Sequence, residues 1–192
     1  MADRMTREQR HRCMSRIHSR NTRPEMLVRR FLFANGFRYR VNVRRLPGTP
    51  DIVLGRLRTC IFINGCFWHG HRGCTKYVEP KTNAGFWKDK IARNIARDEL
   101  NAQRLDTLAW TVITVWECEL SKKNLDATIT RIEADLQAAK AKYDSYLAIR
   151  RENREFARKQ AQKHREILAQ VEAELNLPKS LRSYAKKAQE EE

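Results

Sequence analysis

The chain has 192 residues, which is enough for one ordinary domain with its own core and a helical appendage. It contains 39 lysines and arginines against 23 acids, and the resulting formal net charge of +16 favours a polyanionic partner, a nucleic acid above all. No apolar run approaches the about 20 residues of a membrane-spanning helix, and the opening MADRMTREQR lacks the apolar stretch of a signal peptide, so we expect a cytoplasmic protein without a membrane partner.

The first part of the chain is rich in arginine and poor in acids. We therefore expect residues 1–22 to form a basic arm that clamps DNA phosphates. A helix start follows directly, because Thr22 can cap the helix, Pro24 suits its first turn and Glu25 offers the carboxylate of a capping box. This helix should end just before Gly36, which is a typical stop signal.

Strand-like and helical patterns alternate in the following segment. Three β-type stretches come first, at residues 38–43, 50–55 and 58–64. A tight turn at Gly55 should join the last two. Residues 85–108 carry apolar side chains at helical spacing, and 110–116, WTVITVW, are typical of a buried strand. The mixture predicts an α/β core in which helices flank a mixed central sheet.

After Leu120 the pattern becomes helical. Apolar residues recur at alternating steps of four and three, as in a heptad seam, at Leu125, Ile129, Ile132, Leu136, Ala139, Tyr143 and Tyr146. Arg150 and Asn153 interrupt the seam. An assembly protein that self-associates through this seam is one hypothesis, and the interruption argues against it.

These patterns divide the chain into three parts. Residues 1–120 form the predicted domain, and 121–177 form a helical extension, either one long helix or two helices in a hairpin. Residues 178–192, which begin with Pro178, are predicted to be a flexible tail.

The segment INGCFWHGHRGC, residues 63–74, contains metal-ligand chemistry. Cys66, His71 and Cys74 suit zinc, which takes four nitrogen or sulfur ligands in a tetrahedral arrangement. Cys118 is the best candidate for the fourth ligand, because it follows a predicted core strand whose end could meet this loop. Four protein ligands would make a closed, structural site. The alternative interpretation is unrelated buried cysteines and a surface histidine.

Asp51 and His69 are candidates for hydrolytic chemistry. Asp51 follows Pro50 at the start of an apolar strand, where a carboxylate is costly unless it is exposed or bound to a metal such as Mg2+. Pro-Asp at this place is also the first half of the PD-(D/E)xK nuclease pattern. The next strand, CIFING, lacks the second half, and His69 could supply the missing acid or base. The simpler alternatives are a turn cap for Asp51 and a structural histidine.

Together these motifs resemble the very short patch repair (Vsr) DNA mismatch endonucleases. LPGTPDIV, IFINGCFWHGHRGC, FWKDKIARNIARD and WTVITVWECEL match that family in order and spacing over about residues 1–120. The resemblance implies a variant of the restriction-endonuclease fold with one structural Zn2+. It implies Mg2+-dependent phosphodiester hydrolysis that nicks the strand 5′ of the thymine in T:G mismatches, which arise when 5-methylcytosine deaminates.

Carried over by position, the resemblance implies a catalytic set. Asp51 would bind Mg2+ together with the backbone carbonyl of Ile63, and His69 would be the general base or acid. Asp98 matches an acid that supports the catalytic histidines, and Glu25 matches a helix carboxylate near the site. The implied zinc ligands are the four residues already named from their spacing.

The resemblance also implies an aromatic wedge that enters the duplex beside the mismatch. Its members would be Phe67, Trp68 and Trp87, with Met14 as their counterpart from the N-terminal arm. Insertion of such side chains costs a few kcal/mol of unstacking per base step, and the cost is lowest at a weakened base pair. Insertion itself therefore discriminates between mismatched and matched DNA. Core packing is the alternative, which the position of Phe67 and Trp68 between zinc ligands argues against.

Two residues depart from the family pattern. Ile63 and Asn64 stand where the best-known pattern has Thr-His before Gly-Cys. The first change is harmless if only the carbonyl binds metal. The second removes a histidine that would pair with Asp98, so Asp98 should orient either Asn64 or His69.

The expected partner is double-stranded DNA with a T:G mismatch, with other mismatch-repair proteins as further candidates and nucleoid association when DNA is bound. Two other functions stay open at this point. One is a restriction-type or nicking endonuclease that acts on unmismatched DNA. The other is a catalytically silent, zinc-braced DNA-binding protein.

Overall fold

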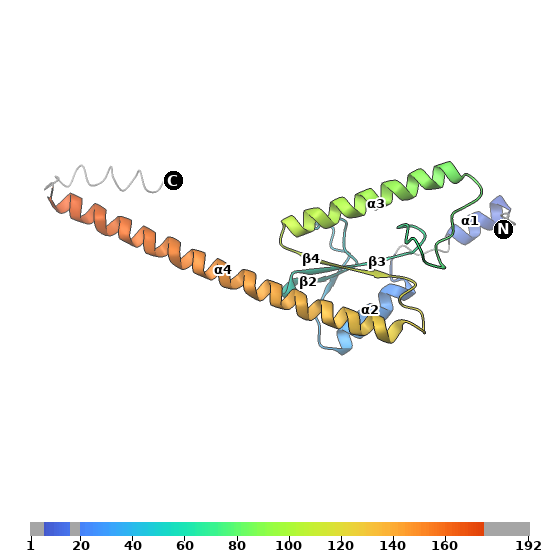
Figure 1. The fold of residues 1–192 in the computed structure, drawn as a ribbon, viewed down its shortest axis with the longest axis horizontal. Coiled ribbons are helices and arrows are strands. Elements are labelled where there is room, and N and C mark those ends of the chain that lie inside the picture. Colours follow the sequence, from blue (N-terminus) through green and yellow to red (C-terminus); the bar gives the residue numbers. More distant parts are fainter. Residues whose placement is uncertain (1–5, 16–19, 175–192) are drawn as a thin grey trace. The chain divides into compact units, whose positions relative to one another are not determined.

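The structure of the chain is a computed structural model that describes residues 6–15 and 20–174. Its elements, in chain order, are α1 (Arg7–Ser15), α2 (Arg23–Ala34), β1 (Arg40–Val41), β2 (Ile52–Leu54), the 3-10 helix η1 (Gly55–Leu57), β3 (Thr59–Asn64), α3 (Ala84–Thr107), β4 (Thr111–Trp116) and α4 (Leu125–Glu174) (Figure 1). The chain divides into two compact units, Met1–Tyr143 and Asp144–Glu192.

Four strands form one mixed sheet in the order β1-β2-β3-β4. β1 pairs antiparallel with β2, and β2 pairs antiparallel with β3. β4 returns through α3 to lie parallel to β3, with Ile113 opposite Ile61. Helices flank this sheet (Figure 1). The predicted α/β class, a mixed sheet flanked by helices, is therefore confirmed.

The hairpin region differs in detail from the prediction. The turn between β2 and β3 is the 3-10 helix η1 followed by Arg58 in the left-handed region, and not a tight turn at Gly55 alone. Only Arg40 and Val41 of the stretch 38–43 are strand, because Asn42 has a φ of 48° that ends the extended backbone.

The core of the first unit lies on both faces of the sheet. On one face, α2 and the start of α4 bury apolar side chains against the strands, namely Val28, Leu32, Ile52, Leu54, Ile61, Ile113, Val115, Leu120, Ile132 and Leu136. On the other face, Leu105 of α3 packs with Val53 and Cys60. Ile52 and Val53 reach opposite layers because successive strand residues point to opposite faces.

The predicted heptad seam is largely the sheet-facing side of α4. Ile132, Leu136 and Ala139 are 0, 1 and 2% exposed within the first unit. This part of the seam is therefore occupied by the chain's own sheet and not by a second copy. The helical pattern forms one continuous helix and not a hairpin, and the division at residue 120 stays a prediction. Within the described residues, no helix has the length and apolar character needed to cross a membrane.

Candidate active site and metal cluster

The N-terminus of α2 holds the Glu25 carboxylate in a closed network. The Thr22 hydroxyl donates to Oε1 at 2.9 Å, the Asn21 N–H donates to Oε2 at 3.1 Å, and Arg29 Nη2 donates to Oε2 at 2.7 Å. The side chains of Glu25 and Arg29 are each 7% exposed. The predicted capping residues are thus in place, and they fix Glu25 beside the cleft described below.

Asp51 lies at the start of β2, after a constrained loop. Gly48 has a φ of 75°, which favours glycine, and a Cβ there would meet the side chains of Asn101 and Phe62 at 3.1 Å, so these neighbours would have to shift by a few tenths of an ångström. Thr49 has a φ of 51°, an unusual conformation for a β-branched residue. This loop brings Asp51 to a position where its Oδ2 accepts the Ile63 N–H at 2.8 Å.

The electrostatic environment of Asp51 disfavours its ionised form. Burial is the largest cause of a raised pKa for Asp51, and the nearby carboxylate of Glu25 raises it further. The N–H of Ile63 and the positive charges of Arg29 and His69 oppose this rise but do not cancel it. Two carboxylates that approach one cleft in this way form a place where a cation would be stabilising.

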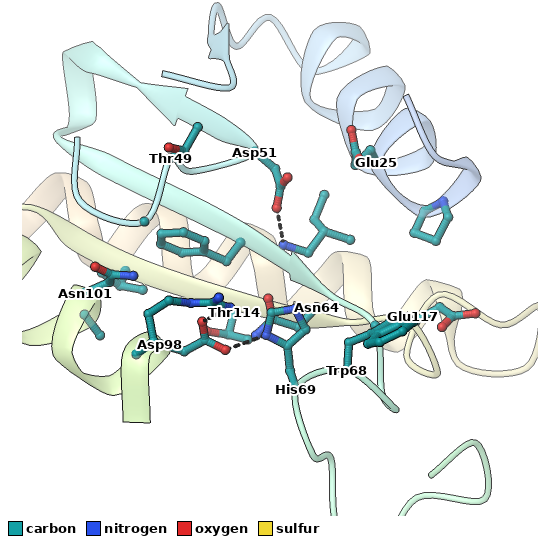
Figure 2. A pocket seen from close by; sticks show the side chains of 18 of the residues that line it. Glu25, Thr49, Asp51, Asn64, Trp68, His69, Asp98, Asn101, Thr114 and Glu117 are labelled. Carbon is teal, nitrogen blue, oxygen red and sulfur yellow. Dashed lines mark hydrogen bonds and ion pairs between the residues drawn. The ribbon is translucent and has the colours of Figure 1, made fainter. Parts of the chain in front are cut away.

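His69 is held by α3. The Asn94 side chain donates to the carbonyl of Trp68 at 2.9 Å, which fixes the loop before the histidine. His69 Nδ1 lies 2.5 Å from Asp98 Oδ2, and the two side chains are 24% and 31% exposed. Asp98 therefore contacts His69 and not Asn64, which decides between the two partners that the sequence left open (Figure 2).

One cleft, with a volume of about 1040 Å³, is lined by Glu25, Asp51, Ile63, His69 and Asp98. Figure 2 shows Asp51 facing His69 and Asp98 across it, with Glu25 at its side. The structure thus brings the whole predicted catalytic set together.

Sequence reasoning did not single out the other polar residues of the cleft, which are Thr49, Arg97, Asn101, Thr114 and Glu117. Asn101 was the easiest to find, because it lies three residues after Asp98 on the same side of α3.

The four predicted zinc ligands also meet. The ligand atoms of Cys66, His71, Cys74 and Cys118 all lie within 4.8 Å of one another. Tetrahedral zinc with bonds of about 2.3 Å to sulfur needs sulfur atoms about 3.8 Å apart, so the geometry fits such an ion. The His71 ring stacks on Trp116 with its centroid 4.1 Å away, and its Nδ1 lies 3.4 Å from Cys118 Sγ.

Three thiols at this spacing have unequal proton affinities. Burial raises the pKa of Cys118 to about 12 and also raises that of Cys66, whereas the N–H of Lys76 lowers the pKa of Cys74. A soft divalent cation stabilises all three as thiolates, which the protein groups alone do not.

An aromatic cluster, defined as Phe67, Trp68, Phe86 and Trp87, lies beside the cleft. Phe67 and Trp68 have ring centroids 5.2 Å apart, and Trp87 lies 5.2 Å from Phe67 and 5.8 Å from Trp68. Phe86, which the wedge prediction did not include, contacts Trp87 at 5.4 Å and is 56% exposed. Trp68 belongs to both the cluster and the wall of the cleft. Phe67, Trp68 and Trp87 are half-buried, so Phe86 is the exposed member of a packed group of rings, and rings next to a polar cleft suit stacking on bases.

Met14, the predicted fourth member of the wedge, lies in α1, and its side chain falls outside the described residues. The described side chains of the wedge therefore come from α3 and from the loop between Cys66 and His71 alone.

Comparison with known proteins yields one family. The family model described as DNA mismatch endonuclease Vsr matches residues 2–76. The chain is 50% identical over 123 residues to the Type II nicking enzyme V.NmeAIP of Neisseria meningitidis serogroup A, covering 64% of this chain and 87% of that protein. It is 46% identical over 121 residues to the Type II nicking enzyme V.XorIIP of Xanthomonas oryzae, covering 63% and 88%. It is 40% identical over 120 residues to the DNA mismatch endonuclease Vsr of Escherichia coli, covering 62% and 76%.

Proposed function

Because the chain belongs to the Vsr family of DNA mismatch endonucleases, we propose that it nicks DNA 5′ of the thymine in a T:G mismatch, as the first step of very short patch repair. The observation that carries this proposal is the aromatic cluster beside the cleft, of which Trp68 lines the cleft wall. Aromatic side chains inserted next to a base step are opposed by stacking, and a mismatched step resists least. The chain is a DNA endonuclease, and the fold we propose for it is a PD-(D/E)xK variant of the restriction-endonuclease fold.

We assign the Mg2+ site to the Asp51 carboxylate and the backbone carbonyl of Ile63. The N–H of Ile63 binds Asp51 Oδ2, so the backbone of Ile63 lies next to the carboxylate. Among the described residues, Asp51 Oδ1 has no hydrogen-bond partner. Burial and the nearby Glu25 raise the pKa of Asp51, which means that the protein groups alone disfavour its negative charge. A bound cation would stabilise that charge. When bound, Mg2+ supplies a Lewis acid that polarises the scissile phosphate and stabilises the leaving oxygen.

His69 performs the proton transfer in this proposal. With the Asp98 carboxylate accepting the Nδ1 proton, Nε2 is the nitrogen that can take a proton from water or give one to the leaving oxygen. Asp98 thus fixes the tautomer and the ring orientation. Glu25 has both carboxylate oxygens engaged by its own helix and Arg29, so its role is to hold the cleft wall and add negative charge beside Asp51.

Substitution of His69 by glutamine should lower the rate of nicking about 10²–10⁴-fold, the usual contribution of a general acid or base. Asp98→Asn should lower it about 100-fold, because the amide can stabilise the wrong tautomer of His69. Single-turnover nicking at saturating enzyme measures both rates. The apparent affinity for the duplex should stay unchanged in each variant.

Glu99→Gln is the matched control for Asp98, since this neighbouring acid is exposed on α3 and lies outside the cleft. It should nick at the wild-type rate. Full activity of Asp98→Asn would show that the contact with His69 has no part in the reaction.

The cluster Cys66, His71, Cys74 and Cys118 is proposed to bind one structural Zn2+. Its support is the convergence of three sulfurs and one ring nitrogen from two distant segments. His69 and the residues Phe67 and Trp68 lie within the loop that these ligands close. The ion would therefore hold both the proton-transfer group and part of the aromatic cluster in position.

The test of the proposed function is nicking of a labelled T:G duplex beside its T:A control, with Mg2+ and varied flanking bases. We expect a nick 5′ of the thymine in the mismatched duplex only. Trp87→Ala should lower the preference for the mismatch about tenfold, because stacking on a base contributes about 1–3 kcal/mol. Phe33→Ala, which removes a 61% exposed aromatic of α2 outside the cluster, should leave the preference unchanged.

A second candidate function follows from the names of two relatives, which are Type II nicking enzymes. A nicking endonuclease that acts on unmismatched DNA would cut both duplexes equally, and the flanking sequence alone would determine cutting. Binding to both duplexes without cutting would instead support the hypothesis of a catalytically silent DNA-binding protein. An interaction with other mismatch-repair proteins and action at the chromosome in the cytoplasm stay predictions.

A further inference from the structure

The part of α4 that belongs to the second unit carries an unusual distribution of arginine. Five arginines recur between positions 150 and 165, at Arg150, Arg151, Arg154, Arg158 and Arg165. At about 100° of rotation per residue they all fall within an arc of about 100° on the helix surface. The only other residue of this segment within the arc is Ala161. We call these five residues the arginine stripe.

All residues of the arginine stripe are exposed. Within the part of the chain that the structure describes, none of them forms an ion pair with an acid. Arg150 contacts the ring of Tyr146 at 5.8 Å. The acids of the segment, Glu152 and Glu155, lie outside the arc by the same rotation, so the stripe is free of negative charge.

This arrangement works against the helix that carries it. Arg150, Arg154 and Arg158 follow one another at spacings of four, and like charges at that spacing destabilise a helix by about 0.2–0.5 kcal/mol per pair. Acids at some of these positions would remove the repulsion. An anionic partner that lies along the stripe would also relieve the repulsion between the arginines, and this relief would add to the favourable free energy of binding.

The type of cation narrows the class of partner. Lys159 and Lys163 lie outside the arc, so the stripe contains guanidinium groups only. Guanidinium presents a planar fork of N–H donors that binds phosphate through two parallel hydrogen bonds, which ammonium cannot do. The segment from 150 to 165 is about 23 Å long at 1.5 Å per residue. Duplex DNA carries one phosphate per about 1.7 Å of its axis, so several phosphates lie within that reach.

We propose that the arginine stripe is a second DNA-binding surface, which contacts backbone phosphates without reading sequence. DNA is the favoured polyanion because the chain belongs to a family of DNA endonucleases. The stripe lies beyond residues 2–76, which the family model matches. The inference rests on that family membership and does not depend on T:G specificity. Its consequence is tighter retention of the enzyme on duplex DNA of any sequence.

The experiment compares two variants of the full chain that each lose two positive charges from the same helical segment. Arg154→Gln with Arg158→Gln removes the middle of the stripe, and Lys159→Gln with Lys163→Gln is the matched control outside it. Glutamine keeps helix propensity close to that of arginine and lysine, and far-UV circular dichroism checks the helix content. Affinity for a fully matched duplex is measured over a series of salt concentrations, without added Mg2+ so that no strand is cut.

Loss of two phosphate contacts should lower the slope of log K against log salt by about 1.8 and weaken binding about 30-fold at physiological salt. The lysine control should keep the wild-type slope, because unbound charges release no counterions. Equal slopes for the two variants would overturn the proposal, since overall charge alone would then explain the binding. A variant that loses affinity for duplex RNA but not for DNA would overturn DNA as the partner.

The absence of Mg2+ separates this result from the proposed function, because binding to matched DNA is measured without catalysis. With saturating enzyme and Mg2+, the arginine variant should nick at the wild-type rate. A protein without any T:G preference could still show the change in slope.

Discussion

Asp51→Asn should abolish nicking and, in the absence of divalent metal, make the protein more stable at neutral pH. The loss of nicking follows from the loss of the proposed Mg2+ ligand, whose contribution of several kcal/mol to the transition state corresponds to about 1000-fold or more in rate. The gain in stability follows from the position of the carboxylate. Its burial and the nearby Glu25 raise the pKa of Asp51, so the folded state holds the charged form at a cost.

The raised pKa of Asp51 determines whether the free energy of unfolding rises or falls with pH. Between the ordinary value of 3.8 and the higher pKa of Asp51 in the folded protein, the folded state binds more protons than the unfolded state. The free energy of unfolding therefore falls as pH rises through that window, and the loss is complete above it. Asparagine does not ionise, so the variant keeps its free energy of unfolding across this window, and its side-chain oxygen can still accept a hydrogen bond from the Ile63 N–H. The variant should therefore be more stable than wild type by the largest amount at neutral pH, and the difference should vanish below the window.

Thermal unfolding without added Mg2+, at neutral and at acidic pH, measures this advantage. Addition of Mg2+ should then stabilise the wild type and leave the variant nearly unchanged, because the variant has lost the charged ligand of the proposed site. Asp89→Asn, a change at an exposed acid of α3, is the control and should alter neither stability nor nicking. If Asp51→Asn nicked at the wild-type rate, Asp51 would not be a catalytic residue.

The cluster of Cys66, His71, Cys74 and Cys118 shows how much of a site can be predicted from order along the chain. Cys118 was expected to meet the loop of Cys66 because it follows a core strand. The structure supplies the mechanism: β3 and β4 are parallel neighbours, so the residues after Asn64 and after Trp116 emerge at the same edge of the sheet. Local pattern and topology agree here, so a contact between positions distant in sequence could be foreseen.

The contact between His69 and Asp98 could not be chosen from the sequence, because it depends on how closely the loop between Cys66 and His71 approaches α3. Gly70 has a φ of 64°, and a Cβ there would lie 2.7 Å from Ile95 and 2.9 Å from Ile91. Only glycine permits that approach. No pattern in the sequence measures the spacing between a loop and a helix.

The seam of α4 was ambiguous for another reason. Apolar residues spaced four and three apart are required equally by a coiled-coil partner and by a sheet beneath the helix. Ile132 and Leu136 satisfy both descriptions, and only the tertiary structure shows that the sheet covers them. Hydrophobic periodicity predicts that a face is buried, and it does not identify what buries it.

Cys118→Ser should remove the bound zinc and lower the stability of the protein by several kcal/mol, because a structural zinc contributes its binding energy directly to folding. Cys118 lies outside the catalytic cleft, so a merely local change would leave nicking intact. We expect nicking to be lost instead. His69 lies between the ligands Cys66 and His71, and without the ion nothing equivalent closes the loop that carries it.

Three measurements test these steps: metal content reports loss of zinc, thermal unfolding reports loss of stability, and limited proteolysis of the loop 65–80 reports whether that loop stays ordered. Cys60→Ala is the matched control, since Cys60 is a fully buried thiol that belongs to the core beneath α3 and not to the cluster. It should lose some stability through a small cavity but keep one zinc per chain, a protected loop and normal nicking. If Cys118→Ser retained zinc and a protected loop, the fourth ligand would have to be another group. If it lost zinc but still nicked at the full rate, the ion would stabilise the fold without positioning His69.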